Sequence, residues 1–301
     1  MSGRLTLTTA GCLSLYYIHR YRFLTIAQAA KAAGVSKGHA EDMLHSFARR
    51  DLLGHFGNVV MPGHGKTPKV YFLKRRGWEL LRSESGIPEE LIGSFVEVHQ
   101  EATWSPQMYH RLSLLDVLLA IEVAVRERPA LNVVKTMLEY RRTRRAGRLQ
   151  RETMDYVSVE EKPENRIIPD AAIILENVET GRRALFFLEM DMATERIVTK
   201  ISHDTRLTIR FKFEQYDRYL LGLRFVGTYK VFGDFSSFVL LFVTLSAERL
   251  ENIRSALVDL PSELHRYYRF ATFTDAVSDP LGAVWVSRSP TDTERYRLTR
   301  H

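Results

Sequence analysis

The sequence predicts a two-domain protein of the mixed α+β and α/β class, in which a small helical domain with two strands precedes a larger α/β domain. Three observations support this class. The 301 residues are enough for two domains of ordinary size. The first part of the chain alternates amphipathic helices with two β-like runs, whereas the rest alternates apolar helices with short runs rich in β-branched and aromatic residues. A Ser/Gly/Pro cluster at residues 83–88 separates the two patterns.

The expected domain boundaries follow from this cluster. We expect a first domain at residues 1–83, a connecting segment at 84–109 and a second domain at 110–301. The composition is globular, with 45% hydrophobic and 26% charged residues, and the net charge of +7 favours a polyanionic partner. The one cysteine, Cys12, excludes a disulfide framework within the chain and a cysteine-based zinc site.

The sequence carries no sign of a secretory signal or of a membrane span. The N-terminus lacks an apolar core of signal-peptide length. The most apolar stretch, residues 235–245, is too short to span a bilayer and predicts a buried strand. We therefore expect a cytoplasmic protein with no membrane partner, and no motif indicates a small-molecule cofactor.

Helix-capping residues define the elements of the first domain. Thr25 and Ser36 can each cap a helix through their hydroxyl oxygens, and Gly34 supplies the turn between the two helices. Two β-like runs then flank the loop MPGHGKTP. The expected order is helix, helix, helix, strand, strand, helix, at residues 8–19, 25–33, 36–50, 52–60, 69–73 and 75–81.

This order is typical of a winged helix-turn-helix, in which the second helix of the pair enters the major groove of DNA and a hairpin forms the wing. Double-stranded DNA is therefore the expected partner. Basic residues would contact phosphates, and small polar residues near the helix start would reach base edges. The expected DNA contacts are Ser36, Lys37, His39, Arg49, Arg50, His64, Lys66 and Lys69. Two alternatives stay open: a plain amphipathic helical hairpin, and a winged helix that binds protein.

The second domain is predicted to run helix, three strands, helix, strand. Its strands are short apolar runs, which are typical of strands buried on both faces. The segment ELHRYYRF, with Tyr267 and Tyr268, predicts a further short helix. The main elements are expected at residues 112–125, 132–140, 167–175, 184–190, 205–221 and within 231–245.

Acidic residues lie at the ends of two of these strands. Asp170 follows Pro169 at a strand edge, whereas Glu189 and Asp191 are two residues apart and so point to the same face of the next strand. If the two strands are neighbours, the three carboxylates converge. Such a group repels itself unless a cation is present. Mg²⁺ or Mn²⁺ would suit these oxygen ligands, could activate a water and would stabilise a phosphoryl transition state.

The arrangement matches the PD-(D/E)XK pattern of nucleases: Pro-Asp, a hairpin, then Glu-X-Lys. Asp191 stands where that pattern has lysine, so Lys200 or Lys212 would have to supply the positive charge. Glu139, at the end of the preceding strand, is a fourth candidate metal ligand, and Glu122 on the first helix is a weaker one. The predicted fold is a nuclease-like αβββαβ domain with the candidate catalytic residues Asp170, Glu189, Asp191 and Lys200. The alternative is that Glu189 and Asp191 are edge charges paired with arginines such as Arg182, Arg183 or Arg196.

A dense basic run, RRTRRAGRLQR, occupies residues 141–151. The run falls between two predicted strands, so we expect a loop or a hairpin tip. It would contact DNA phosphates beside the acidic cleft, because arginines that neutralise phosphates release counterions from DNA. The candidates are Arg141, Arg142, Arg144, Arg145, Arg148 and Arg151. A solvated loop is the alternative.

Several segments resemble the replication-relaxation protein family of plasmids and integrative elements: HRLSLLDVLLAI, RIIPDAAIIL, FFLEMDMATE, KFEQYDRYL, FVLLFVTLS and AVWVS. The resemblance covers nearly the whole chain, and the series PDA…LExD…TE…KxxxY is its most specific part. It implies a DNA-binding protein of a mobile element that acts in plasmid replication, transfer or their control.

Two other functions compete with this one. The chain could be a Mg²⁺-dependent endonuclease that nicks or cleaves DNA, or a transcriptional repressor whose second domain mediates dimerisation and makes the protein a homodimer. The geometry of Asp170, Glu189 and Asp191, together with a usable lysine, separates the endonuclease from the other two hypotheses.

Overall fold

The computed structural model describes residues 7–61, 65–98, 104–145, 147–199 and 208–299. The chain forms two compact units, residues 1–119 and 120–301, and the division between them falls within helix α6. The segment expected to connect two domains, 84–109, lies in the first unit. Within the described ranges, no helix has both the length and the apolar character that a membrane crossing requires.

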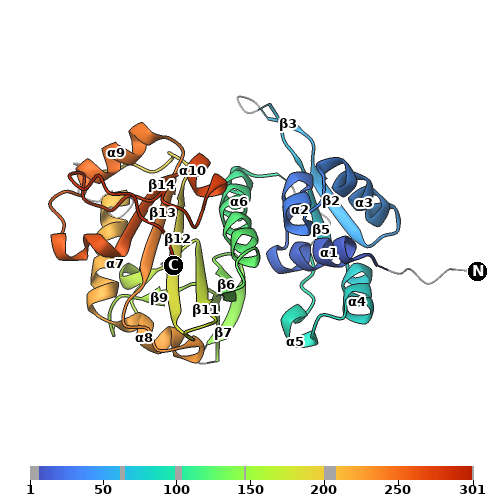
Figure 1. The fold of residues 1–301 in the computed structure, drawn as a ribbon, viewed down its shortest axis with the longest axis horizontal. Helices are drawn as coiled ribbons and strands as arrows, with labels where there is room; N and C mark the ends of the chain where they lie inside the picture. Colours follow the sequence, from blue (N-terminus) through green and yellow to red (C-terminus); the bar gives the residue numbers. More distant parts are fainter. Residues whose placement is uncertain (1–6, 62–64, 99–103, 146, 200–207, 300–301) are drawn as a thin grey trace, which may run out of the picture. The chain divides into compact units, whose positions relative to one another are not determined.

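The first unit combines short helices with a small antiparallel sheet in the strand order β1-β5-β2 (Figure 1). A separate hairpin, β3–β4, extends the loop between β2 and β5. The helices are α1 (Thr9–Tyr21), α2 (Ile26–Ala33), α3 (Lys37–Arg49), α4 (Arg75–Glu84), α5 (Glu89–Ile92) and the beginning of α6 (Pro106–Arg126). The strands are β1 (Leu24–Thr25), β2 (Leu53–Gly57), β3 (Val60–Met61), β4 (Gly65–Lys66) and β5 (Lys69–Leu73).

The predicted helix caps are confirmed. The Thr25 hydroxyl accepts from the Gln28 amide at 3.2 Å and the Gln28 side chain accepts from the Thr25 amide at 3.0 Å, which makes a capping box at the start of α2. Gly34 ends α2 in the left-handed conformation, with φ of 69°. Ser36 then caps α3 by accepting from the amide of His39 at 3.2 Å. The sequence therefore sets both the turn between these helices and the first residue of each.

The strand expected at residues 52–60 is interrupted. β2 ends at Gly57, whose φ of 89° no L side chain adopts easily and where a Cβ atom would lie 2.4 Å from the carbonyl oxygen of Pro68. Asn58 follows with φ of 64°, and the chain resumes as β3. Thr67 closes the base of the hairpin, because its hydroxyl accepts from the amide of Val59 at 3.1 Å.

The second unit is built on a five-stranded sheet in the order β14-β13-β12-β11-β6. β6, β11 and β12 pair antiparallel, whereas β12, β13 and β14 pair parallel. These strands are β6 (Leu131–Leu138), β11 (Ala171–Asn177), β12 (Arg183–Asp191), β13 (Val239–Thr244) and β14 (Tyr268–Thr272). Smaller strands are β7 (Arg142–Arg145), β8 (Arg148–Arg151), β9 (Asp155–Tyr156) and β10 (Arg166–Ile167). The helices after β12 are α7 (Ile209–Leu221), α8 (Arg224–Tyr229), α9 (Ala247–Ala256) and α10 (Phe273–Ser278). Short 3₁₀ helices lie at Pro163–Asn165, Lys230–Phe232 and Ser262–Tyr267.

One face of this sheet carries the main core, and α7, α8 and α9 cover it (Figure 1). Phe187 of β12 and Phe213 of α7 are fully buried there. The Phe213 ring stacks on Phe270 of β14 at 5.3 Å and meets Phe242 of β13 at 5.2 Å. This aromatic packing fixes α7 against the strands, and α7 carries the side chains of the site described below.

A buried ion pair also holds α7. Arg288 is fully buried and donates to both carboxylate oxygens of Asp217 on α7, at 2.8 and 2.9 Å. The Tyr268 hydroxyl donates to the same carboxylate. Because a buried charge is costly without a partner, this contact ties the end of the chain and β14 to α7.

Two predictions for the second unit are wrong in detail. The strand expected at residues 167–175 is two strands, β10 and β11, which belong to different sheets. Pro169 lies between them and has no backbone N–H to donate to a strand neighbour, so the pairing stops there. Tyr268 was expected in a helix but lies in β14, a fifth strand of the sheet that the predicted order omits.

Candidate functional site

The site lies where β12 ends. Alternate residues of this strand share a face, and Leu185 and Phe187 of that face are buried in the core. Glu189 and Asp191 continue the same row and are 3% and 7% exposed. The prediction that these two acids share a face is confirmed by the strand register, which pairs Glu189 with Phe242 and Asp191 with Thr244 of β13.

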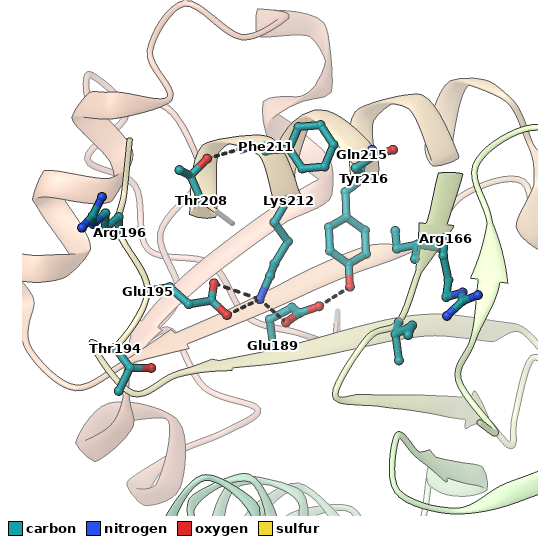
Figure 2. Close-up of a pocket in the computed structure, with 12 residues that line it drawn as sticks. Arg166, Glu189, Thr194, Glu195, Arg196, Thr208, Phe211, Lys212, Gln215 and Tyr216 are labelled. Carbon is teal, nitrogen blue, oxygen red and sulfur yellow. Dashed lines mark hydrogen bonds and ion pairs between the residues drawn. The ribbon is translucent and has the colours of Figure 1, made fainter. Parts of the chain in front are cut away.

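Two side chains of α7 hold the Glu189 carboxylate. Lys212 donates to Oε2 at 3.1 Å, and the Tyr216 hydroxyl donates to Oε1 at 2.5 Å (Figure 2). Lys212 and Tyr216 are four residues apart, so they lie one above the other on one face of the helix. Lys212 also donates to Glu195 at 3.3 Å, so its ammonium lies between two carboxylates.

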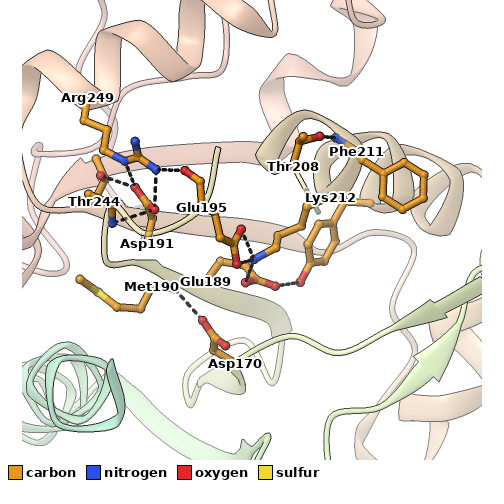
Figure 3. Close-up of polar contacts among 12 residues, drawn as sticks. Asp170, Glu189, Met190, Asp191, Glu195, Thr208, Phe211, Lys212, Thr244 and Arg249 are labelled. Atoms are coloured by element: carbon orange, nitrogen blue, oxygen red, sulfur yellow. Dashed lines mark hydrogen bonds and ion pairs between the residues drawn. The ribbon is translucent and has the colours of Figure 1, made fainter. Parts of the chain in front are cut away.

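Asp170 lies directly before β11. The first residue pair of the β11–β12 ladder is Ala171 with Leu188, so continuing the register by one residue places Asp170 opposite Glu189. The Asp170 carboxylate accepts from the backbone amide of Met190 at 2.8 Å (Figure 3). Of the predicted acidic residues, Asp170 and Glu189 are therefore neighbours across two antiparallel strands.

Burial and the surrounding charges determine the ionisation of Glu189 and Lys212. Burial raises the pKa of Glu189 to about 7, and the charge of Asp170 acts in the same direction, whereas Lys212 and the Tyr216 hydrogen bond oppose it. Burial alone would lower the pKa of Lys212, but the charges of Glu189, Asp170 and Glu195 outweigh burial and raise it. Lys212 is therefore a cation at neutral pH, and Glu189 takes up a proton at a higher pH than an exposed glutamate does.

Asp191 has a different set of partners although it lies only two residues from Glu189. Arg249 of α9 donates to both of its carboxylate oxygens, at 2.5 and 3.0 Å, and Thr244 donates at 2.7 Å (Figure 3). Arg249 also donates to the backbone carbonyl of Glu195 at 2.7 Å. The Asp191–Arg249 pair therefore fixes the same loop from which Glu195 reaches Lys212.

The remaining residues predicted for a metal or catalytic role have other side-chain partners or lie outside the described residues, although the backbone amide of Glu139 donates to the carbonyl of Asp170 at 3.0 Å. Glu139 pairs with Arg151 of the β7–β8 hairpin. Glu122 on α6 accepts from Thr136 at 2.8 Å. Lys200 lies outside the described residues. Among the residues that the structure describes, no three His, Cys, Asp or Glu side chains come close enough together to hold a metal ion.

The arginine beside Asp191 differs from those proposed on sequence grounds, whereas the lysine beside Glu189 was one of two candidates. Arg183, one of the proposed arginines, donates to Glu176 at 2.8 Å instead. Lys212 was considered as a source of positive charge, and the series KxxxY already contained both Lys212 and Tyr216. Arg249 was missed, because nothing in the sequence relates it to an aspartate 58 residues earlier.

A pocket of about 630 Å³ opens beside Glu189 (Figure 2). Its walls come from β10, from the loop after β12 and from the first turns of α7. The residues that line it are Arg166, Ile167, Ile168, Glu189, Thr194, Glu195, Arg196, Thr208, Phe211, Lys212, Gln215 and Tyr216. Asp170 and Asp191 are absent from this lining.

The residues predicted to contact DNA in the first unit are mostly exposed. α3 buries Ala40, Leu44 and Phe47 on one face. The exposed residues are Ser36, Lys37, His39, Arg49 and Arg50 on or beside α3, and Lys66 on β4. Lys69 is partly buried and lies 3.4 Å from His45. His64 lies outside the described residues.

The arginine run forms the β7–β8 hairpin, as expected. Arg142 faces Arg151, and Arg145 faces Arg148, across the two strands. Four of the arginines bind protein groups: Arg141 pairs with Glu152, Arg151 with Glu139 and Arg148 with Glu161, and Arg145 donates to the carbonyl of Met154. The exposed arginines are Arg142, Arg144 and Arg148.

These features define a mixed α/β protein in which two buried carboxylates at the end of β12 each pair with a cation from a neighbouring helix. The profile of the replication-relaxation family matches residues 15–234, which include Asp170, Glu189, Lys212 and Tyr216 but not Arg249. The chain belongs to the replication-relaxation family. No curated protein and no solved structure gives a significant match.

The raised pKa of Glu189 predicts a specific pH dependence of stability. Between about pH 4.5 and 7 the folded chain keeps a proton on Glu189 that the unfolded chain releases, so the free energy of unfolding falls as pH rises through this window. Replacing Glu189→Gln removes this titration. In urea unfolding at pH 5 and pH 8, the wild type should lose up to about 3 kcal/mol relative to the variant.

Tyr216→Phe provides the internal control. It keeps the carboxyl but deletes a hydrogen bond that favours the ionised form, so the pH window of the stability loss should move upward. A wild type and a Glu189→Gln variant whose stabilities run parallel from pH 5 to pH 8 would contradict the assigned ionisation.

Proposed function

We propose that the chain is a double-stranded-DNA-binding protein that acts in the replication or transfer of a plasmid or another mobile element, or in their control. Its first unit acts as a winged helix-turn-helix, and its second unit is a PD-(D/E)XK nuclease-like domain. The observation that carries the proposal is the exposed outer face of α3, which follows a capped helix and a glycine turn.

α3 has the features of a recognition helix. Its buried residues occupy one face, and Gly38, Asp42 and Arg49 on the opposite face are exposed. Its first turn presents the N-cap Ser36 together with Lys37 and His39, all exposed. The N-terminus of a helix carries partial positive charge, which favours a phosphate. Glu41 and Asp42 are also exposed on α3, and these acids would limit nonspecific attraction to DNA.

The β3–β4 hairpin supports the same proposal as a wing. The hydrogen bonds between Val59 and Thr67 fix its base, at 2.9 and 3.1 Å. Lys66 on β4 is exposed and would reach a phosphate. Val60, which faces Lys66 across the hairpin, is 78% exposed and would be open to the same partner.

The β7–β8 hairpin adds a second basic element. Like charges directly opposite each other across two strands destabilise a hairpin, and this hairpin has two such arginine pairs. Phosphates would relieve that repulsion. A two-stranded ribbon also fits the major groove of duplex DNA. We therefore assign Arg142, Arg144 and Arg148 to phosphate contacts.

The first test replaces Lys37→Ala and Lys66→Ala together. Each lysine that neutralises a phosphate adds about 0.9 to the slope of log affinity against log salt, so the double variant should bind duplex DNA more weakly with a slope smaller by about 2. Fluorescence anisotropy over a salt series measures this. Lys230→Ala, an exposed lysine of the second unit, is the matched control. Unchanged affinity and slope would refute the winged-helix assignment.

The second test concerns the hairpin. Replacing Arg142→Ala and Arg144→Ala should lower affinity by the same factor, within about twofold, for a preferred site and for a scrambled duplex, because phosphates carry no base information. Arg182→Ala with Lys230→Ala removes two exposed cations of the same unit as a control. A loss on one sequence only would indicate base contacts, and no loss on either would leave the hairpin as a solvated element.

A second candidate function is Mg²⁺-dependent cleavage of DNA. The neighbouring pair Asp170 and Glu189, with Lys212 beside it, favours this candidate. Lys212 would supply the positive charge that is lacking at the position of Asp191. The sheet of three antiparallel strands followed by a helix and a parallel strand also agrees with a nuclease-like αβββαβ domain.

The residues fit a Mg²⁺ ion held by two carboxylates rather than by three or four. Mg²⁺ sites in proteins commonly use one or two carboxylates, with waters and substrate phosphates in the other positions. Asp170 and Glu189 would provide these ligands, whereas Asp191 and Glu139 already bind arginines. When bound, the ion would polarise a phosphodiester and lower the pKa of a water. Lys212 would leave Glu189 on metal binding and stay held by Glu195.

Plasmid cleavage tests this candidate. Nicking should need Mg²⁺ or Mn²⁺ and should be faster at pH 8 than at pH 6, because a ligand carboxylate must be ionised and Glu189 has a pKa of about 7. Asp170→Asn should abolish it, whereas Asp234→Asn, an exposed acid of the same unit, should not. Cleavage that survives Asp170→Asn, or no cleavage under any of these conditions, would exclude a nuclease at this site and leave the DNA-binding proposal standing.

A further inference from the structure

The pocket beside Glu189 has the size of a ligand site. Its volume of about 630 Å³ lies within the roughly 300–1,000 Å³ of pockets that hold small ligands. Its floor is formed by Glu189 and Lys212, and Figure 2 shows Arg196 and Arg166 on opposite sides of it. Of the two candidate metal ligands only Glu189 lines this space, so the function proposed above uses little of the pocket.

The charges on the pocket wall favour a phosphate. Glu189 and Glu195 are the two acids of the lining, and both bind Lys212. Arg166 and Arg196 line the pocket and are exposed. The planar guanidinium group of arginine can bind two phosphate oxygens at once.

The wall contributed by α7 favours a base. Phe211 is partly buried and lines the pocket, one residue from Lys212. An aromatic ring in such a position provides a stacking surface for any of the four bases. The neighbouring amide of Gln215 is already engaged, because its Nε2 donates to Glu164 and its Oε1 accepts from Arg218. The pocket would therefore bind a base by stacking and would discriminate little among the four bases.

We propose that this pocket binds one unpaired nucleotide of a DNA strand, with its base against Phe211 and its two flanking phosphates toward Arg196 and Arg166, on either side of Lys212. The proposal rests on the DNA-binding function proposed above. It adds that the second unit takes a nucleotide that has left the base stack, at a strand end, a gap or a distorted pair. Extracting a paired base costs unstacking and unpairing free energy, so unpaired positions would be preferred.

Photocrosslinking of the full chain tests the proposal. 5-Iododeoxyuridine crosslinks to an aromatic ring stacked on it, and mass spectrometry locates the crosslink. The probes are a gapped duplex with the iodinated base in the gap, a full duplex with the same base paired, and free 5-iododeoxyuridine monophosphate. We expect a crosslink at Phe211 from the gapped duplex, at least about tenfold above the full duplex. Phe211→Leu should abolish it, and Arg166→Ala should reduce it.

The control variants are Phe232→Leu, a partly buried aromatic outside the pocket lining, and Arg182→Ala, an exposed arginine of the same unit. Both should leave the yield at Phe211 unchanged. A crosslink elsewhere, an equal yield from the paired base, or a crosslink at Phe211 from the free nucleotide alone would each overturn the assignment to a DNA strand. Anisotropy on the same gapped and full duplexes reports DNA binding separately: duplex binding without a crosslink at Phe211 defeats the pocket only, and absence of duplex binding defeats the function proposed above.

Discussion

A carboxylate buried at the end of a core strand imposes the main constraint on the second unit. Glu189 is 3% exposed and continues a row of apolar side chains, so it needs hydrogen-bond donors that only a covering helix can supply. Lys212 and Tyr216 of α7 supply them from adjacent turns, one to each oxygen. The rotation of α7 on the sheet is thereby fixed, and with it the wall of the pocket. The site and the core are parts of one packing arrangement.

Glu189 and Asp191, the two acids at the end of β12, bind different cations because side chains from different helices contact them. Asp191 binds Arg249 of α9 through two oxygens, and Glu189 binds Lys212 of α7. Glu195 connects the two pairs, since its backbone accepts from Arg249 and its carboxylate binds Lys212. The acids are therefore compensated by the protein's own cations. A Mg²⁺ ion would have to compete with Lys212 for Glu189, but it would not have to break the Asp191 pair.

Local chemistry made much of the fold predictable, and long-range contacts account for the rest. Thr25, Gly34 and Ser36 predicted where α2 begins and ends and where α3 begins, because capping depends on neighbouring residues only. The shared face of Glu189 and Asp191 followed from strand periodicity. No local pattern could choose between Lys200 and Lys212 as the partner of Glu189, or reveal Arg249, since these contacts depend on how helices pack on the sheet. Pro169 has no backbone N–H, so the break between β10 and β11 was predictable in principle. It was missed because the residues on both sides of Pro169 form one apolar run that is typical of a single strand.

The Glu189–Lys212 contact can be tested by a double-mutant cycle of Glu189→Gln and Lys212→Met, with the free energy of unfolding measured in urea at pH 8. Lys212→Met leaves a buried carboxylate with one cation fewer and should be the most destabilising single change. The double variant should be more stable than the sum of the two losses predicts, with a coupling energy of at least about 1 kcal/mol. Losses that add within about 0.5 kcal/mol would contradict the account, because α7 would then not depend on this pair for its position.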